Sequence, residues 1–475
     1  MTTYPAGALD DLQALLAGAR WFGGKGRDWS VASVRRLGAL PGHGAGVQAV
    51  VDLVEVHYLG ADGSPQQPEF YQVPLSLRTA PAEHLEHARI GTWADPDGTQ
   101  VHVYDALHDR DAMALWLDAF AEPGRSTGPG LRFHRLPGHQ LDQSTHSTLF
   151  SGEQSNSSVM FGEDSLLKVF RRLTPGTNPD IAIHEVLTAA GGDHVAALYG
   201  CLEADAPEGE DRLQLAMLQQ FLRTATDGWD LALASVRNLF LEADLHPHDV
   251  GGDFAGEAGR LGQALAEVHA ELAQRFATHV LTPDEVVARV DAMVARVDEA
   301  VAVVPELAAH RDEIVAAFEA LSGLGEQIPI EVQRIHGDLH LGQTLRTVKG
   351  WKFVDFEGEP ATPLAHRQLP DSPWRDVAGM LRSFDYAPSA ATLTGRTAEP
   401  GDAADQQAFR GAEWAARNSQ AFLLGYCGAE VSGPQSTLLR AYVLDKAVYE
   451  TLYEARNRPT WVSIPLAGIR RWVTA

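Results

Sequence analysis

The spacing of apolar residues changes near residue 226, and this change constrains the fold more than any other feature of the chain. Before it, short stretches alternate apolar and polar residues with the period of two that strands show. After it, apolar residues recur every three or four positions, which is the period of amphipathic helices. We therefore expect a β-rich front half and a helical back half.

The two halves predict an α/β protein with a small β insertion in its helical part. The expected strands of the front half are residues 47–56, 70–77, 101–104, 165–170, 195–202 and 213–221, with a further β-rich stretch at 150–160. Its expected helices are 105–120 and 179–190. Long helical patterns follow at 254–276, 283–304 and 306–321, and again from 374 to the end. Two short β-like segments interrupt the helices between residues 328 and 359.

Composition argues against several classes of protein. Lys and Arg number 38 against 63 Asp and Glu, a formal net charge of −25, and such a surface repels nucleic acid and anionic membranes. No run of about 18 apolar residues predicts a membrane span, and residues 1–20 lack the features of a secretory signal. Two distant cysteines, Cys201 and Cys427, do not support a disulfide framework. We expect a cytoplasmic protein without nucleic-acid or membrane partners.

The β insertion carries the most informative polar pattern of the chain, HGDLHLGQTLR at 336–346 and VDFEGEP at 354–360. Phosphoryl transfer needs a carboxylate that accepts the proton of the attacking hydroxyl, and oxygen ligands that hold Mg²⁺ on the phosphates. Asp338 can supply this carboxylate, and Gln343 can supply an amide oxygen from the same loop. Asp355 follows a short apolar strand and can bind Mg²⁺ beside the phosphates. The pattern therefore indicates phosphoryl transfer.

The same loop allows a second interpretation. His336, Asp338 and His340 alternate as the ligands of metal-dependent hydrolases do. A catalytic zinc site would need a further ligand from elsewhere in the chain. The carboxylate at the end of the next strand fits phosphoryl transfer better, so the hydrolase is kept as the alternative from a different class.

The loop resembles the His-Gly-Asp-x-His-x-x-Asn loop of the aminoglycoside-phosphotransferase superfamily, with Gln343 in place of the Asn. The chain resembles still more closely the actinobacterial maltokinase-like group and its glucosamine kinase branch. The similarity extends through RWFGGKGR at 20–27, GEQSNSSVMFG at 152–162, LLKVFRRLTPGTNPDI at 166–181, SPWRDVAGMLRSFDYA at 372–387 and LDKAVYETLYEARNRP at 444–459. In the resembling family the histidine at the position of His336 braces the loop.

This resemblance implies a bilobal, protein-kinase-like fold with an N-terminal β-rich cap. The expected divisions are a cap at 1–90, an ATP-binding β-rich subdomain at 91–222 and a helical lobe at 223–475. The implied activity is that of an ATP-dependent sugar kinase that uses Mg²⁺, a transferase of carbohydrate metabolism. A kinase-like binding module without catalysis is a further alternative, but all the required polar groups are present. The basic segment 20–27 is left as a phosphate contact, a contact with the other lobe or a surface turn.

Lys168 lies among apolar residues of an expected strand, where an ammonium group needs an anion. The kinase pattern assigns this lysine to the nucleotide phosphates, paired with a helix glutamate, and Glu185 on the next helix is the candidate. A lysine that points to solvent from an edge strand is the alternative. The polar loop before this strand and the expected hinge complete the nucleotide-binding set: Ser155, Asn156, Ser157, Gln219, Phe221 and Leu222. For the loop, an ordinary polar turn is the alternative.

Two acceptors are compatible with the resemblance, maltose at its anomeric hydroxyl and glucosamine at its 6-hydroxyl. Three departures from maltokinases favour glucosamine: residues 364–369 lack an Arg-rich run, Trp374 replaces a Leu, and Asn457 replaces a ring. An indole in the acceptor site would shorten it to one sugar ring, and carboxylates would hold the ammonium group. The expected substrate-binding residues are His340, Glu357, Glu359, Trp374, Asp445, Tyr449 and Tyr453.

Overall fold

The computed structural model forms two compact units. Unit 1 comprises Met1–Glu185 and Ala196–Arg223, and unit 2 comprises Val186–Val195 and Thr224–Ala475. The structure describes all residues except 1–3, 6, 41–45, 61, 95–97, 124–129, 151–154, 208–210, 243–244, 326, 360–361, 395–401 and 475. The expected division at 1–90, 91–222 and 223–475 stays a prediction.

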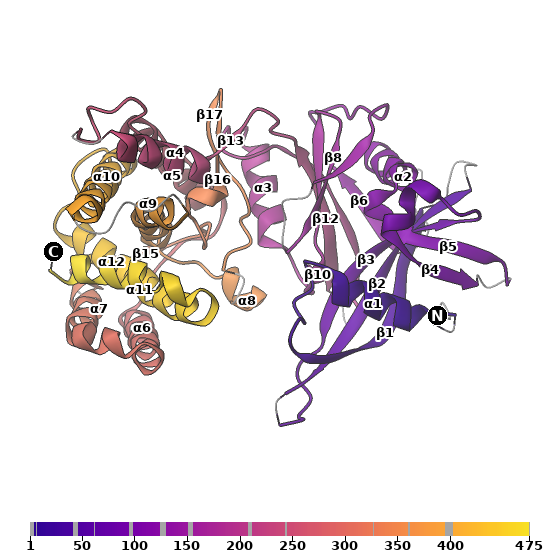
Figure 1. Cartoon of the computed structure of the whole chain (residues 1–475), viewed down its shortest axis with the longest axis horizontal. Coiled ribbons are helices and arrows are strands. Elements are labelled where there is room, and N and C mark those ends of the chain that lie inside the picture. Colours follow the sequence, from indigo (N-terminus) through magenta and orange to yellow (C-terminus); the bar gives the residue numbers. More distant parts are fainter. Residues whose placement is uncertain are drawn as a thin grey trace. The chain divides into compact units, whose positions relative to one another are not determined.

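Unit 1 begins with an antiparallel sheet whose strand order is β1-β2-β3-β5-β4, with β10 beside β3 (Figure 1). Its elements are α1 (Ala8–Gly18), β1 (Asp28–Leu40), β2 (Val47–Leu59), β3 (Glu69–Arg78), β4 (Arg89–Ala94), β5 (Gln100–Asp105) and β10 (Arg172–Leu173). The basic segment 20–27 packs onto this sheet, because Phe22 joins the buried core and the Arg27 guanidinium lies 3.5 Å from the ring centre of Tyr58.

A second antiparallel sheet follows in unit 1, with the order β6-β11-β12-β9-β8-β7. Its strands are β6 (Leu131–Arg135), β7 (Ser147–Phe150), β8 (Ser157–Phe161), β9 (Ser165–Val169), β11 (Leu198–Asp205) and β12 (Arg212–Gln220), and the helices near it are α2 (Arg110–Ala121) and α3 (Pro179–Ala189). The β-rich stretch expected at 150–160 includes the end of β7 and most of β8, which pair antiparallel. Trp116 of α2 packs edge-on against Phe133 of β6 in the buried core.

Unit 2 is built mainly from helices. Those described are α4 (Gly228–Leu241), α5 (Ala255–Arg275), α6 (Pro283–Val303), α7 (Arg311–Gly325), α8 (Leu364–Arg367), α9 (Trp374–Thr394), α10 (Asp402–Cys427), α11 (Pro434–Asn457) and α12 (Ser463–Thr474). Helices α5 and α10 approach closely where Gly262 meets the backbone of Phe422, since a Cβ at Gly262 would lie 2.1 Å from the Phe422 carbonyl oxygen. A side chain there would separate the two helices.

The β insertion predicted in the helical part is present in unit 2. Strands β16 (Thr344–Thr347) and β17 (Gly350–Phe353) form a hairpin, and β13 (Thr226–Asp227) pairs with β16. Trp351 and Phe353 are buried and fix the hairpin on the helices. The segment 336–343 therefore emerges between β15 (Glu331–Val332) and a rigid hairpin.

Within the described ranges, every helix is too short or too polar to cross a membrane.

Cys201 and Cys427 are both free thiols, and burial raises the pKa of the Cys201 thiol to about 12. This thiol is therefore protonated at neutral pH and unreactive.

Candidate active site

The loop that carries Asp338 is held to the neighbouring strand by His336. The Nε2 atom of His336 donates to the Val354 carbonyl oxygen at 2.9 Å, at the end of the hairpin strand. Gly337 has a φ of 87°, a left-handed conformation that favours glycine. The turn at Gly337 directs the chain into Asp338, and His336 occupies the bracing position expected for it.

A buried carboxylate of α9 holds the same loop from the other side. Asp376 accepts hydrogen bonds from the backbone nitrogens of His336 at 2.8 Å and Gly337 at 2.9 Å. It also accepts a hydrogen bond at 3.0 Å from Nε2 of His269, whose Nδ1 lies 2.8 Å from the Tyr426 hydroxyl. Burial alone would raise the pKa of Asp376, but the His269 hydrogen bond and nearby positive charge lower it below its usual value. Asp376 is therefore an ionised anchor.

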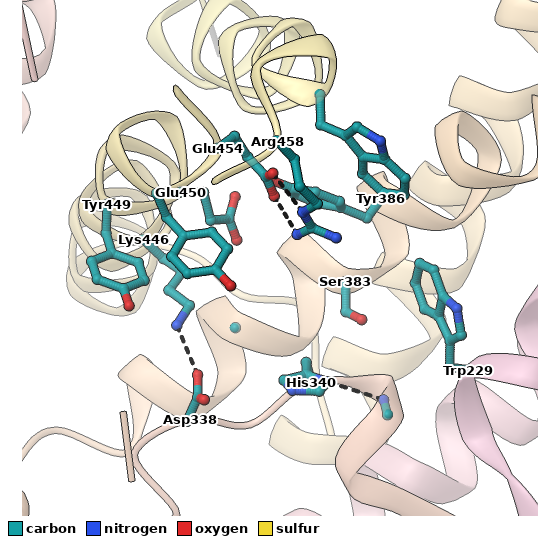
Figure 2. Close-up of a pocket in the computed structure, with 14 residues that line it drawn as sticks. Trp229, Asp338, His340, Ser383, Tyr386, Lys446, Tyr449, Glu450, Glu454 and Arg458 are labelled. Atoms are coloured by element: carbon teal, nitrogen blue, oxygen red, sulfur yellow. Dashed lines mark hydrogen bonds and ion pairs between the residues drawn. The ribbon is translucent and has the colours of Figure 1, made fainter. Parts of the chain in front are cut away.

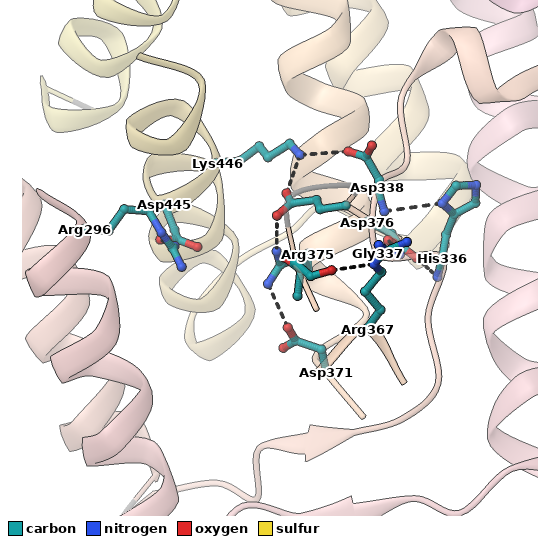
Figure 3. A network of polar contacts seen from close by, with 12 residues as sticks. Arg296, His336, Gly337, Asp338, Arg367, Asp371, Arg375, Asp376, Asp445 and Lys446 are labelled. Carbon is teal, nitrogen blue, oxygen red and sulfur yellow. Dashed lines mark hydrogen bonds and ion pairs between the residues drawn. The ribbon is translucent and has the colours of Figure 1, made fainter. Parts of the chain in front are cut away.

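The Asp338 carboxylate begins a chain of alternating charges (Figure 3). The Lys446 ammonium donates to Asp338 Oδ1 at 3.1 Å and to Glu359 Oε1 at 2.8 Å. Arg375 in turn donates to Glu359 at 3.0 Å and to Asp371 at 3.0 Å. Each carboxylate in the chain is bonded to a cation, which compensates for its removal from water.

Burial and the neighbouring charges determine the protonation states of Asp338 and His340 in this loop. Burial alone would raise the pKa of Asp338, but Lys446 and the two nearby histidines lower it below its usual value. Burial lowers the pKa of His340, and the Asp338 charge offsets this only in part. At neutral pH Asp338 is therefore a carboxylate, while His340 is a neutral imidazole whose Nδ1 accepts a hydrogen bond at 3.1 Å from the Gly342 nitrogen.

Gln343 and Asp355 lie side by side, as the motif predicted. The Gln343 amide nitrogen donates to Asp355 Oδ2 at 3.0 Å. Asp355 has a φ of 68° and is, among the described residues, the non-glycine residue at positive φ. Such strain is typical of functional sites, where the surrounding structure holds it. A carboxylate and an amide oxygen are hard ligands, so this pair fits Mg²⁺.

The three residues of the alternative zinc interpretation do not converge on one point. His336 donates to a strand carbonyl, and His340 accepts from a backbone nitrogen in its own loop. Asp338 is bonded to Lys446 instead. No set of three ligand atoms from these residues occurs in the part of the chain that the structure describes. The geometry therefore gives the hydrolase no support.

A cavity of about 400 Å³ in unit 2 opens onto Asp338 (Figure 2). Its lining comes from α11, α9, α4, the 336–343 loop and the segment after α11. The residues are Trp229, Asp338, His340, Gly342, Gly379, Ser383, Tyr386, Lys446, Tyr449, Glu450, Tyr453, Glu454, Arg458 and Trp461. This volume is within the usual size of small-molecule sites.

Aromatic rings and carboxylates dominate the cavity wall. Tyr449 and Tyr453 stack with ring centres 6.4 Å apart. The guanidinium of Arg458 lies 4.6 Å from the ring centre of Trp461 and bonds both oxygens of Glu454, at 2.6 and 2.8 Å. Aromatic faces beside carboxylates are suited to a sugar, whose ring has apolar faces and polar edges.

Among the carboxylates that line the cavity, Glu450 is the one whose buried negative charge is least compensated by neighbouring cations. Its Oε2 accepts a hydrogen bond at 2.8 Å from Arg382, a buried arginine that also binds Asp385. Burial raises the pKa of Glu450 above its usual value, although Arg382 and Lys446 lower it in part. A further cation beside Glu450 would therefore be stabilised.

Unit 1 contains the predicted lysine with a different partner. The Lys168 ammonium donates to Asp180 Oδ2 at 2.8 Å, and both side chains are buried. Glu185 is exposed, so the expected Lys168–Glu185 pair is wrong. Burial would raise the pKa of Asp180, but Lys168 and His184 lower it far below its usual value. The acid lies in the first turn of α3, more than one helical turn before Glu185.

The other nucleotide-binding candidates also lie in unit 1. Asn156 and Ser157 are buried and Ser155 is exposed, while residues 152–154 of the same loop lie outside the described residues. In the expected hinge, the Phe221 backbone nitrogen donates to the Asp164 carbonyl at 3.1 Å. Gln219 is buried, and Phe221 and Leu222 are partly buried.

Two predicted acceptor residues lie away from the cavity. Trp374 packs edge-on against Tyr426, with ring centres 6.0 Å apart, and does not line the cavity. Asp445 points from α11 to Arg296 of α6 and is bonded to it. The expectation that these two residues line the acceptor site is therefore corrected. Trp374, at the start of α9, packs against Tyr426, and Asp445 forms an ion pair on the side of α11 away from Lys446.

The other acceptor candidates divide between the cavity and its surroundings. His340, Tyr449 and Tyr453 line the cavity. Glu359 is buried and is linked to Asp338 by Lys446, whose ammonium donates to both carboxylates. Glu357 is partly buried in the segment after β17 and is not among the lining residues.

Sequence reasoning missed several residues of the site. Lys446, Glu450 and Glu454 follow one another at intervals of four along α11, and Arg458 comes four residues later, directly after the helix. This spacing places them on one helical face. That spacing was the available signal. Trp229, Ser383, Tyr386 and Trp461 carry no comparable pattern, and the fold alone brings them to the cavity.

Comparisons with known proteins agree with this arrangement. Residues 16–109 match the maltokinase N-terminal cap domain. A glucosamine kinase of Mycolicibacterium smegmatis is 28% identical over 319 residues, covering 67% of this chain and 77% of that protein. A glucosamine kinase of Streptacidiphilus jiangxiensis is 29% identical over 442 residues, covering 88% and 89%.

Solved structures show the same fold. A glucosamine kinase in complex with glucosamine, ADP and inorganic phosphate has a TM-score of 0.64 at 24% identity, covering 95% of this chain and 96% of that chain. A glucosamine kinase in crystal form B has a TM-score of 0.67 at 22% identity, covering 97% and 99%. The predicted kinase-like fold with a β-rich N-terminal cap is confirmed. Within that class, the findings support the maltokinase-like and glucosamine kinase group.

Proposed function

We propose that the chain is an ATP-dependent sugar kinase with glucosamine as its favoured acceptor, giving glucosamine 6-phosphate. The observation that carries the proposal is the position of Asp338, an ionised carboxylate at a sugar-sized cavity walled by tyrosines and carboxylates. The similarity to glucosamine kinases over most of the chain supports it. The two free cysteines support a cytoplasmic location.

In this proposal, Asp338 orients the acceptor hydroxyl and accepts its proton as the γ-phosphoryl group is transferred. The transition state of phosphoryl transfer is loose, so positioning matters more than the strength of the base. This agrees with an Asp338 pKa below the usual range, which gives an ionised but weakly basic carboxylate. The neutral His340 in the same cavity can donate to, or accept from, a second hydroxyl of the sugar.

Asp355 and Gln343 are the proposed metal ligands of unit 2. Turning the Gln343 amide presents its oxygen beside the Asp355 carboxylate, which gives two hard oxygen ligands. Mg²⁺ bound there would neutralise charge on the nucleotide phosphates. Asp355 follows strand β17 on a strained backbone with a φ of 68°, which is typical of functional positions.

The proposed nucleotide-binding groups of unit 1 centre on Lys168. Its ammonium is fixed by Asp180 at 2.8 Å, the lysine–acid pairing that kinases use to orient a phosphate-binding lysine. The remaining groups proposed for the nucleotide are the loop residues Ser155, Asn156 and Ser157 and the hinge residues Gln219, Phe221 and Leu222.

The choice of glucosamine rests on the carboxylates of the cavity. Glu450 and Glu454 replace Glu357, Glu359 and Asp445 as the proposed ammonium-binding groups, because these two carboxylates line the cavity and the other three do not. An ammonium group beside Glu450 would compensate a carboxylate whose pKa burial raises. Maltose remains the second candidate, because residues 16–109 match a maltokinase cap domain.

The activity is tested by incubating the protein with ATP, Mg²⁺ and glucosamine. We expect ADP release that depends on glucosamine, and a product whose phosphate is located at the 6-hydroxyl by NMR. Asp338→Asn should lower kcat by about 10²–10⁴-fold, as loss of a general base does. ADP release that is independent of every sugar, or unchanged in Asp338→Asn, would contradict the proposal.

A further inference from the structure

Lys446 holds the Asp338 carboxylate from a distant helix. It lies on α11, 108 residues along the chain from Asp338, and its ammonium is 3.1 Å from Asp338 Oδ1. Only 15% of its side chain is exposed, although it borders the cavity. A lysine placed there at the cost of its hydration implies a role for its charge.

The surroundings fix this ammonium in place. Glu359 accepts from it at 2.8 Å, and the Tyr449 ring centre lies 4.9 Å away. Arg375 holds Glu359 at 3.0 Å, so Glu359 cannot turn towards Asp338 or the cavity without breaking an ion pair. Burial would lower the pKa of Lys446, but Glu359 and Asp338 raise it well above its usual value. The ammonium is therefore permanently charged and immobile.

The two oxygens of the Asp338 carboxylate therefore differ in their contacts. Oδ1 is engaged by Lys446, and no hydrogen bond to Oδ2 is recorded among the described residues. A carboxylate with one oxygen held can rotate little about its last torsion, so the other oxygen keeps a fixed direction. The direction matters because a displacement of about 1 Å from the reacting geometry can cost about 10² in rate.

We propose that Lys446 is a positioning residue for phosphoryl transfer, which holds the Asp338 carboxylate towards the acceptor hydroxyl and is itself held by Glu359 and Arg375. The inference rests on the proposed function and deepens it. Lys446 acts through Asp338, and its contribution is lost when that carboxylate is absent.

Several titratable groups face Asp338 besides Lys446. His336 and His340 face it from its own loop, Glu359 from the segment after β17, and Tyr449 from α11. Of the cations and histidines, Lys446 has the largest lowering effect on the pKa of Asp338. Removing Lys446 should therefore move the acidic limb of kcat/KM to higher pH, because Asp338 would bind its proton more tightly.

The test compares Lys446→Met and Lys446→Arg with the wild type. Lys446→Met keeps an unbranched side chain without charge, and we expect kcat to fall by about 10²-fold while KM for ATP stays the same. Lys446→Arg keeps the charge and should recover much of the activity. Arg456→Met is the matched control, because Arg456 is an exposed cation of the same helix that pairs with Glu299; its kinetics should equal those of the wild type.

A double variant separates positioning from a general structural effect. If Lys446 acts through Asp338, adding Lys446→Met to Asp338→Asn should cost no further activity. A residue with an independent structural role would lower the residual activity of Asp338→Asn again. Three results would each overturn the inference. They are a double variant in which the two losses of activity add, an acidic limb of kcat/KM that does not move in Lys446→Met, and a near-normal kcat in Lys446→Met.

The outcome is distinguishable from failure of the proposed function. A wild-type protein that phosphorylates no sugar would remove the function itself. An active wild type with an unaffected Lys446→Met would remove only the role of Lys446. The melting temperature of each variant shows whether lost activity follows lost folding, in which case Lys446→Arg and the pH profile decide.

Discussion

The Asp376 carboxylate accepts a hydrogen bond at 2.9 Å from the backbone nitrogen of Gly337, so the first turn of α9 holds the loop that carries the proposed base. An acid near the start of a helix is commonly a cap for its own helix. Here its hydrogen-bonding capacity is used by a different segment. The arrangement links the orientation of Asp338 to the packing of α9 and, through His269, to α5.

Asp376→Asn should therefore destabilise the protein and lower its activity. One carboxylate oxygen becomes an NH₂ group facing a backbone N–H, which leaves a buried donor unsatisfied at a cost of roughly 1–3 kcal/mol. We expect a lower free energy of unfolding and a lower kcat at pH 7. Asp298→Asn, which alters a half-exposed ion pair with Arg311, is the control and should be nearly neutral.

The pH dependence of this difference has a definite sign. The pKa of Asp376 lies below its ordinary value of 3.8, so its stabilising effect is present above that value and is lost as the pH falls through the lower, folded-state pKa. The difference in unfolding free energy between wild type and Asp376→Asn should shrink below about pH 4. Denaturant unfolding at a series of pH values measures it. A gap that widens on acidification would contradict an ionised anchor.

Asp355→Gly and Asp355→Ala form a matched pair for the metal site. Both remove the carboxylate, so both should lose Mg²⁺-dependent activity, while Gln343→Ala should only weaken it. At a φ of 68° glycine is unstrained, whereas alanine costs roughly 1–2 kcal/mol. Asp355→Gly should thus melt at a higher temperature than Asp355→Ala. Mg²⁺ titrations that match the wild type would remove Asp355 from the site.

Asp180→Asn tests the corrected partner of Lys168. Without the carboxylate, the lysine loses the group that orients it, and we expect KM for ATP to rise as it does in Lys168→Met. Glu185→Gln is the control, because Glu185 is exposed on the same helix. Steady-state kinetics with varied ATP would show the difference. Equal effects of the two substitutions would restore Glu185 as a candidate.

Glu450→Gln tests the basis of acceptor choice. The amide keeps the size of the side chain but cannot compensate an ammonium group. We expect kcat/KM for glucosamine to fall by about tenfold to hundredfold, the effect of losing a charge-assisted hydrogen bond. The value for glucose should change less, because glucose brings no charge. A parallel loss for both sugars would show that Glu450 supports the cavity through Arg382 rather than binding the ammonium group.

The sequence predicted those parts of the site that lie close together in the chain. Asp338 and Gln343 share one loop, and Asp355 ends the next hairpin, so motif and spacing were sufficient. The position of Lys446 depends on how α11 packs against that loop, which periodicity does not reveal. Within the cavity wall, the spacing of four from Lys446 to Glu450 and Glu454 was visible, but it did not show which side of the helix faced the base.

The predictions for Trp374 and Glu185 were wrong, and in each case a nearby contact in the fold explains why. Trp374 was expected at the acceptor because it stands where maltokinases have a Leu, but its ring packs on Tyr426 instead. Glu185 was expected as the partner of Lys168 because kinases pair this lysine with a helix glutamate, but the first turn of α3 brings Asp180 within 2.8 Å of its ammonium.

The most direct test of the central claim is kcat/KM measured side by side for glucosamine, glucose and maltose with the wild-type protein at fixed ATP and Mg²⁺. We expect glucosamine well ahead of glucose, because carboxylates in the cavity lose binding energy when the acceptor brings no cation. Maltose should also be poorer than glucosamine, because it likewise brings no cation to the cavity carboxylates. Maltose ahead of glucosamine would contradict the account and favour a maltokinase.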